Sequence, residues 1–165
     1  ETDLNEIIRT PVRKYARQFI AKKISMSYEP VETTVITDKK WLSFVIEQVI
    51  SNAVKYTKTG GIKIYLEDGD GTMSVPVQKA SHRKEDDGEN SGMKSVRLVI
   101  EDTGIGIRAE DLPRICEMGY TGCNGHEGQH SSGIGLYLCS RILKKLGHTF
   151  SITSKEGVGT VVKIG

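Results

Sequence analysis

The segment from Val99 to Ile107 constrains the fold of this chain more than any other. Asp102 comes directly after a run of strand-forming apolar residues, namely Val96, Leu98, Val99 and Ile100. Gly104 and Gly106 follow Asp102 within four residues. Glycines permit positive φ angles and let a ligand come close to the backbone. The segment therefore predicts a strand that ends in a tight turn, with a carboxylate that can accept a hydrogen bond from the amino group of a flat heterocycle.

Two known kinds of site share parts of this pattern. Gly104, Gly106 and Ala109 have the spacing of a dinucleotide-binding turn, but the acid expected about 20 residues later on a second strand is missing, and Pro113 falls in the helix. The tripeptide Asp-Thr-Gly that begins at Asp102 is also typical of aspartic proteases. That fold is nearly all β, whereas this chain has three clear helical segments. A plain strand end with a tight turn remains the third interpretation.

The spacing of apolar residues predicts helices and strands in mixed order. Residues 4–22 have helical periodicity, and Pro11 predicts a kink or a late start of this helix. Asp38 stands at the expected N-cap of a long helix over 39–57. Further helices are predicted near 110–117 and over 133–146, and strands over 24–28, 35–37, 62–66, 95–101, 149–153 and 160–164. We therefore expect an α+β fold, a two-layer sandwich in which about three helices pack on one face of a mixed β-sheet.

The length of 165 residues fits one domain over 1–165. Within it, residues 68–94 combine glycines and a charged run with few large apolar residues, which predicts a flexible loop or hairpin insertion. The net charge of +2 excludes nucleic-acid binding driven by bulk charge. No apolar run approaches the ~18–20 residues that a membrane helix needs. The chain starts with Glu1 in place of Met, so we expect a piece of a longer protein.

Neither cysteines nor histidines have the spacing of a metal site. The cysteines are an odd number without a C-x-x-C pair, so we expect reduced thiols at Cys116, Cys123 and Cys139. The histidines are scattered, and none has a second ligand at metal-binding spacing: His82, His126, His130 and His148.

One face of the predicted helix 39–57 carries an acid, a base and amides. Glu47 and Lys55 lie two turns apart, with Gln48 and Asn52 beside them, while the apolar residues form the opposite arc. Amide and carboxylate oxygens are suitable ligands for Mg²⁺, and an ammonium group suits a phosphate. Taken alone, the spacing favours the simpler interpretation of a solvated face with a Glu–Lys pair.

Two more glycine-rich segments follow. The run from Ser131 to Gly135 opens the predicted helix 133–146, where unpaired N–H groups and the helix dipole can bind an anion. A Ser-capped helix after a loop is the alternative. The run from Gly157 to Thr160 by itself predicts a hairpin turn.

In this order, the four segments resemble the motifs of the catalytic and ATP-binding domain of bacterial sensor histidine kinases, in the superfamily shared with gyrase, Hsp90 and MutL. The run Glu47–Tyr56 resembles the N box, and the three glycine boxes resemble Asp102–Gly106, Gly133–Leu136 and Gly157–Thr160. The resemblance covers essentially the whole chain. Two further runs are similar to the intramembrane-sensing, bacitracin-type kinases of Gram-positive bacteria, Thr37–Gln48 and Gly119–Leu138.

The resemblance implies a Bergerat-type ATP-binding fold and roles for individual residues. Asp102 would accept a hydrogen bond from the adenine amino group, with Thr160 nearby. Asn52 would hold Mg²⁺, Glu47 would support the metal or polarise the reaction centre, and Lys55 would contact phosphate, so these three are the implied catalytic residues. The other implied nucleotide-binding residues are Tyr56, Gly104, Gly106, Ile107, Gly119, Tyr120, Thr121, Gly133, Ile134, Gly135 and Leu136.

The implied lid over ATP comprises residues 119–132. The family often has Phe in the segment before the lid, and this chain has Cys116 there. This departure bears on how the lid packs, and it leaves the implied ATP binding in place.

The implied activity is transfer of the γ-phosphoryl group of ATP to a histidine on a dimerisation domain, and from there to an aspartate of a response regulator. None of the four histidines lies in such an acceptor motif, so we expect the acceptor upstream of Glu1 and little activity of this fragment alone. The parent is expected to be a membrane-anchored homodimer of the bacterial plasma membrane with this domain in the cytoplasm, and no nucleic-acid partner is expected. An ATPase clamp of the gyrase or MutL type is the alternative, and a binding module without catalysis is a third.

Overall fold

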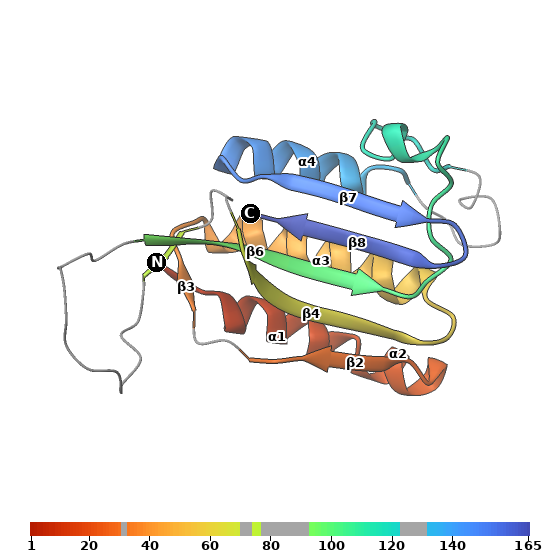
Figure 1. The fold of residues 1–165 in the computed structure, drawn as a ribbon, viewed down its shortest axis with the longest axis horizontal. Helices are drawn as coiled ribbons and strands as arrows, with labels where there is room; N and C mark the ends of the chain where they lie inside the picture. Colours follow the sequence, from red (N-terminus) through yellow and green to blue (C-terminus); the bar gives the residue numbers. More distant parts are fainter. Residues whose placement is uncertain (31–32, 70–73, 77–92, 123–131) are drawn as a thin grey trace.

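A computed structural model describes residues 1–30, 33–69, 74–76, 93–122 and 132–165 (Figure 1). Its helices are α1 (Leu4–Lys14), α2 (Ala16–Lys22), α3 (Lys39–Tyr56), the 3₁₀-helix η1 (Leu112–Arg114) and α4 (Gly135–Leu146). Its strands are β1 (Thr2–Asp3), β2 (Ser25–Tyr28), β3 (Thr34–Val35), β4 (Gly61–Asp68), β5 (Ser74–Pro76), β6 (Met93–Asp102), β7 (Phe150–Lys155) and β8 (Gly159–Ile164).

The main sheet has the strand order β2-β4-β6-β8-β7, with β5 paired to β6. The β2–β4 pair is parallel, and the pairs β4–β6, β6–β8 and β7–β8 are antiparallel, so the sheet is mixed. Figure 1 shows α1, α3 and α4 on one face of this sheet. The predicted α+β fold with helices on one face of a mixed sheet is therefore confirmed.

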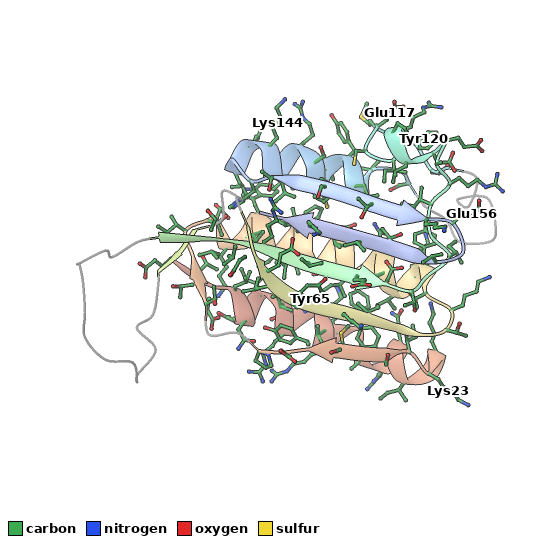
Figure 2. All side chains as sticks on the ribbon, viewed as in Figure 1. Lys23, Tyr65, Glu117, Tyr120, Lys144 and Glu156 are labelled. Atoms are coloured by element: carbon green, nitrogen blue, oxygen red, sulfur yellow. The ribbon has the colours of Figure 1, made fainter. Side chains whose placement is uncertain are left out.

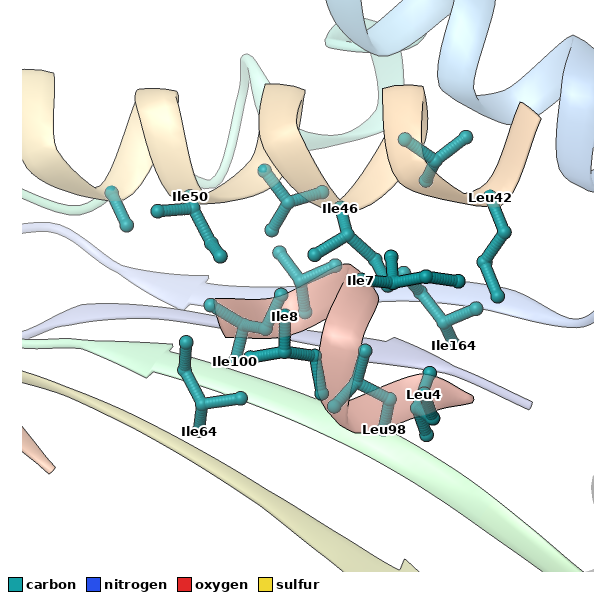
Figure 3. Packing of buried hydrophobic residues seen from close by; sticks show 14 of the residues in the cluster. Leu4, Ile7, Ile8, Leu42, Ile46, Ile50, Ile64, Leu98, Ile100 and Ile164 are labelled. Carbon is teal, nitrogen blue, oxygen red and sulfur yellow. The ribbon is translucent and has the colours of Figure 1, made fainter. Parts of the chain in front are cut away.

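The core lies between α3 and the sheet (Figure 3). Side chains alternate between the two faces of a strand, so every second residue of the central strands points toward the helices. Residues of β4, β6 and β8 meet the apolar arc of α3 in this layer, and all are buried: Leu42, Ile46, Ile50, Ile62, Ile64, Leu98, Ile100 and Ile164. Burial of this apolar surface holds α3 against the sheet.

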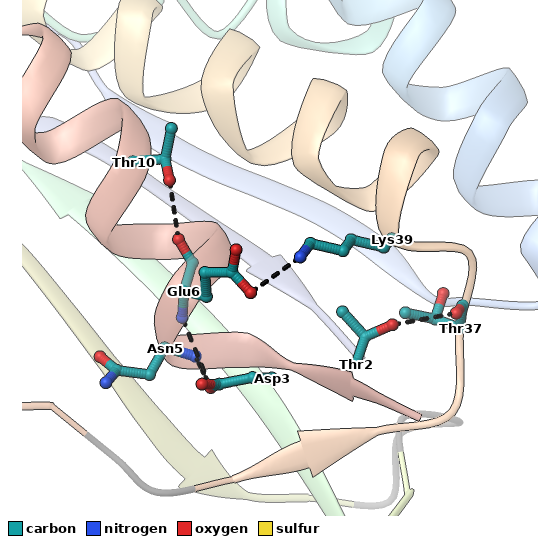
Figure 4. A network of polar contacts seen from close by, with 7 residues as sticks. All are labelled: Thr2, Asp3, Asn5, Glu6, Thr10, Thr37 and Lys39. Atoms are coloured by element: carbon teal, nitrogen blue, oxygen red, sulfur yellow. Dashed lines mark hydrogen bonds and ion pairs between the residues drawn. The ribbon is translucent and has the colours of Figure 1, made fainter.

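A local capping signal starts α3 as predicted, and a second one starts α1. The Asp38 carboxylate accepts a hydrogen bond from the Trp41 backbone N–H at 3.1 Å and begins α3. Asp3 caps α1 in the same way, with the Asn5 N–H at 2.9 Å (Figure 4). Lys39 lies 2.7 Å from Glu6, an ion pair that joins α1 to the start of α3. Gly147, in a left-handed conformation, ends α4 as expected.

The predicted helices differ from the structure at three places. The helix predicted over 4–22 has its predicted ends, Leu4 and Lys22, so Pro11 does not delay its start, but it is divided at Tyr15 into α1 and α2. The helix predicted near 110–117 is only the short η1 with turns, because Pro113 has no N–H to donate and the hydrogen bonds there are mostly of the i to i−3 type. The last helix, α4, starts at Gly135, two residues after the predicted position.

Part of the predicted insertion 68–94 has regular structure. Ser74–Pro76 form β5, which pairs with Met93–Ser95 at the beginning of β6. Residues 70–73 and 77–92 lie outside the described residues.

The thiols of Cys116 and Cys139 are free, as predicted, and Cys123 lies outside the described residues. Burial raises the pKa of Cys139 to about 12. Within the described part of the chain, no helix combines the length and the apolar character needed to cross a membrane.

Candidate nucleotide site

A single cavity gathers most of the predicted site residues. It lies between the second half of α3, the adjoining ends of β6 and β8, and the start of α4, and it holds about 1040 Å³ including open solvent at its mouth. The predicted residues that line it are Asn52, Tyr56, Asp102, Gly106, Ile107, Tyr120, Thr121, Gly133, Gly135, Leu136 and Thr160. The sequence motifs, far apart along the chain, thus meet at one place.

Asp102 is the last residue of β6 and pairs with Thr160 of β8. Its Oδ1 accepts a hydrogen bond from the Gly104 N–H at 2.8 Å. Burial raises the pKa of Asp102 above its usual value, while backbone hydrogen bonds from Gly104 and Thr160 act in the opposite direction. A half-buried acceptor of this kind suits a neutral N–H donor such as a heterocyclic amino group.

A small hydroxyl network supports the Thr160 side of the cavity. The Ser154 hydroxyl lies 2.8 Å from the Thr160 hydroxyl and 2.9 Å from the Gly159 carbonyl oxygen. It also accepts a hydrogen bond from the Ile107 N–H at 2.8 Å. Ser154 thereby ties the turn after Asp102 to β8, a role that no sequence motif indicated.

Gly106 brings this turn close to the β7–β8 hairpin. Its φ is +69°, and a Cβ added to it would lie 2.0 Å from the Lys155 carbonyl oxygen. The Gly157 N–H donates to the Ile105 carbonyl at 2.7 Å beside it. Only glycine fits this approach, which holds the turn against the hairpin.

The C-terminal half of α3 brings Asn52 and Tyr56 to the cavity. Lys55 does not line it, and its Nζ lies over the Tyr56 ring, 5.0 Å from the centroid. Gln48 lies close to the start of α4, because a Cβ on Gly135 would be 2.7 Å from its Oε1. The sequence placed Gln48 beside the functional face without assigning it to the site.

Glu47 is not among the described lining residues. It forms an ion pair with Lys14 at the end of α1, and its side chain is 37% exposed. Asn52 is five positions after Glu47, which turns the two side chains about 140° apart around a helix. The fold therefore directs Glu47 toward α1 and Asn52 toward the cavity.

The start of α4 forms another wall. The Gly119 N–H donates to the Gly133 carbonyl at 3.0 Å, and a Cβ on Gly133 would lie 2.5 Å from the Gly119 carbonyl carbon. Gly104, Gly119 and Ile134 shape the surrounding turns without lining the cavity. The first N–H groups of an α-helix have no partner within it, so this wall can receive an anion. Of the predicted lid, residues 123–131 lie outside the described residues.

Sequence reasoning missed several lining residues. The apolar ones come from α3, the strands and the segment after Asp102, and they resemble ordinary core residues in sequence: Val49, Ala53, Ile100, Ile105, Ile115, Ile152 and Val162. Gly122 and Asp111 also line the cavity, and Asp111 is a buried carboxylate. An acid in a short predicted helix carries no signal of burial, so only the fold reveals it.

Comparison with known protein families assigns this chain to one of them. A family described as histidine kinase-, DNA gyrase B-, and HSP90-like ATPase matches residues 37–165. This chain belongs to that family. The match contains all four motifs, and the resemblance drawn from them is confirmed.

Several curated relatives of this ATPase domain are named as bacterial sensor kinases. Sensor histidine kinase YxdK of Bacillus subtilis is 33% identical over 164 residues, covering 97% of this chain and 43% of the relative. Sensor protein BceS of Halalkalibacterium halodurans is 30% identical over 162 residues, covering 97% and 41%. GraS of Staphylococcus aureus is 34% identical over 134 residues, covering 81% and 32%. The chain thus spans less than half the length of these relatives.

Solved structures of histidine kinases share the fold. Full-length ShkA in complex with AMPPNP matches with a TM-score of 0.72 at 20% identity, over 99% of this chain and 29% of that chain. The catalytic domain of ThkA matches with a TM-score of 0.71 at 20% identity, over 99% and 91%. Mycobacterial MprB matches with a TM-score of 0.67 at 20% identity, over 99% and 93%. This ATPase domain therefore has the fold of histidine kinase catalytic domains.

Proposed function

We propose that this domain binds ATP with Mg²⁺ and transfers the γ-phosphoryl group to a histidine outside the chain. The observation that carries the proposal is the shared cavity of Asp102, Asn52 and the start of α4. A half-buried carboxylate, an amide oxygen and a helix N-terminus are suited to an adenine, a hard cation and a phosphate in turn. Relatives named as sensor histidine kinases support this choice among the ATPases of the family.

The lining residues fit ATP. Asp102 would accept a hydrogen bond from the adenine amino group, with Thr160 beside it. Gly133 and Gly135 line the cavity at the start of α4, where the unpaired N–H groups of a helix can receive phosphates. Apolar side chains such as Ile107 and Leu136 can pack on the faces of a flat ring.

The lining residues also fit Mg²⁺. Among the described residues, no group of three or more His, Cys, Asp or Glu side chains could hold a metal ion. Mg²⁺ does not need one, because it usually takes one or two protein ligands and fills its other positions with phosphate oxygens and water. Asn52 would supply such a ligand. When bound, the ion supplies neutralisation of phosphate charge.

Lys55 and Glu47 keep their predicted roles in this proposal. Lys55 would contact a phosphate by leaving its position over Tyr56, and breaking such a cation–π contact costs about 0.5–2 kcal/mol. Glu47 would support the metal or polarise the reaction centre only after release from Lys14. The variant Glu47→Gln is expected to slow phosphoryl transfer while ATP affinity stays within twofold.

The acceptor and later partners belong to the parent protein. His148 is the one histidine within the described residues, and its Nε2 lies 2.9 Å from the Thr37 hydroxyl in a half-buried place, which leaves it unsuited to accept a phosphoryl group. We propose a phosphoacceptor histidine on a dimerisation domain, a response regulator as the next acceptor, and a membrane-anchored bacterial parent with this domain in the cytoplasm.

Calorimetric titration with ATP and Mg²⁺ tests the site. The variants Asp102→Asn and Asn52→Ala are expected to abolish measurable binding. Asp68→Asn is the matched control, because Asp68 is an exposed carboxylate at the other end of the sheet, and it should bind as the wild type does. Unchanged affinity in Asp102→Asn or Asn52→Ala would overturn the site assignment.

The reaction is tested by adding a separately purified dimerisation domain of the parent. Acid-labile phosphohistidine on that domain is the expected product. Steady release of free phosphate in its absence would favour the ATPase clamp instead.

A further inference from the structure

Asp111 is a buried carboxylate at the cavity wall. Its side chain is 5% exposed, and its Oδ1 accepts a hydrogen bond from the Tyr120 hydroxyl at 2.5 Å. A carboxylate removed from water needs hydrogen bonds to offset the lost hydration, and an O–H to carboxylate bond is among the stronger kinds. Asp111 and Tyr120 both line the cavity, so this hydrogen bond lies in its wall.

The Tyr120 ring is held on a second side as well. The Arg114 guanidinium lies over the ring, 4.4 Å from the centroid, and Arg114 is itself paired with Glu117 at 3.1 Å. Figure 2 shows Tyr120 and Glu117 together near the start of α4. The Tyr120 N–H donates to the Glu117 carbonyl at 3.3 Å. The hydroxyl, one face of the ring and the backbone N–H of Tyr120 therefore all have a partner.

We infer that Asp111 is a positioning residue, which orients the Tyr120 ring as a preformed wall of the nucleotide cavity. This inference rests on the proposed nucleotide binding. A tyrosine side chain on a turn has several rotamers, and binding would have to select one of them at a cost in free energy. The hydrogen bond to Asp111 fixes the Tyr120 rotamer before the nucleotide binds. It therefore raises the affinity for ATP without contacting the reacting groups.

Four variants separate positioning from a general effect on the fold. Tyr120→Phe removes only the hydroxyl, Asp111→Ala removes the acceptor, and Asp111→Asn keeps an oxygen that can accept the hydrogen bond. The double variant Asp111→Ala with Tyr120→Phe tests whether the two residues act through each other. Tyr65→Phe is the matched control, because Tyr65 is exposed on β4 far from the cavity (Figure 2).

The measurements are calorimetric ATP affinity of the domain with Mg²⁺, and KM and kcat for ATP in the parent protein. Tyr120→Phe and Asp111→Ala are each expected to weaken ATP binding about tenfold, the low end for a hydrogen bond to a charged group. The double variant should bind no more weakly than either single variant, and Asp111→Asn should restore most of the affinity. The change should appear in KM, with kcat kept.

A wild-type affinity of Tyr120→Phe would overturn the inference, as would losses that add in the double variant. A parallel loss of kcat would overturn it too, because positioning of a wall residue leaves the reacting groups untouched. If Asp111→Ala fails to fold, Tyr120→Phe and Asp111→Asn still decide the question. Absence of ATP binding by the wild-type domain would overturn the proposed function first, and the two failures are thus distinguishable.

Discussion

The Asp102 carboxylate loses much of its hydration because it lies in the cavity wall. Its pKa is raised by this burial above the value of 3.8, so in the pH range between 3.8 and the raised pKa the folded state binds more protons than the unfolded state. The stability that Asp102 contributes therefore rises as pH falls through this range. Asp102→Asn has no such dependence and can still accept the Gly104 N–H.

We predict that, without ligand, Asp102→Asn is at least as stable as the wild type at pH 7, and that the wild type gains on the variant as pH falls toward 4. The free energy of unfolding in urea, measured for both proteins at several pH values, checks this. A difference between the two that stays constant with pH would contradict the burial argument.

Gly106 and Gly157 distinguish two ways in which an added side chain would lower stability, namely backbone strain and a steric clash. Both have positive φ, but a Cβ would clash with the Lys155 carbonyl only at Gly106, whereas nothing lies within 4 Å of a Cβ at Gly157. Gly157→Ala is expected to cost about 1 kcal/mol from backbone strain alone. Gly106→Ala should cost about 4 kcal/mol or more, because the turn after Asp102 must also move from the hairpin. Urea unfolding of both variants checks this, and equal losses would refute the clash.

At the scale of whole elements, a lysine of α2 caps the end of α3. The Lys22 Nζ donates to the carbonyl oxygens of Val54 at 2.5 Å, Lys55 at 3.3 Å and Thr57 at 3.4 Å. The last carbonyls of a helix lack partners within it and carry the negative end of the dipole. The cap thus joins α2 to the same turn of α3 that carries Tyr56.

Lys22→Met keeps an unbranched side chain, one atom shorter, and removes the donor, and it is expected to lower the free energy of unfolding by about 1–2 kcal/mol. Lys23→Met is the matched control, because Lys23 is exposed at the neighbouring position (Figure 2). It should change the free energy by less than about 0.5 kcal/mol. Thermal and urea unfolding measure both, and equal effects would show that the cap contributes nothing specific.

At the scale of the whole molecule, the nucleotide is expected to act as a bridge. The cavity is lined from α3, β6, β8 and the start of α4, so a ligand there contacts elements from both layers of the sandwich. A ligand that binds only the folded state stabilises it by about 2.7 kcal/mol at 100 times its Kd. ATP with Mg²⁺ should therefore raise the Tm clearly, and EDTA should remove most of this increase.

Asp102→Asn provides the control for that experiment. Its Tm should not respond to ATP with or without Mg²⁺, whereas Asp68→Asn should respond as the wild type does. An increase of Tm with ATP that survives in Asp102→Asn would mean that the nucleotide binds elsewhere.

The sequence by itself determined the features that depend on near neighbours in the chain. The apolar arc of α3, its Asp38 cap, the strand that ends at Asp102 and the glycine at the end of α4 are local signals, and each predicted its element correctly. The four motifs also predicted the family, since their order and residue types do not depend on contacts.

Only the tertiary structure decided what depends on residues far apart. It paired Glu47 with Lys14, 33 positions away, and so turned a predicted site residue toward α1. It buried Asp111 in the cavity wall against Tyr120, in a segment where the sequence predicted only a helix near 110–117. Side-chain partners and burial are properties of packed elements, and no periodicity within a single element contains them.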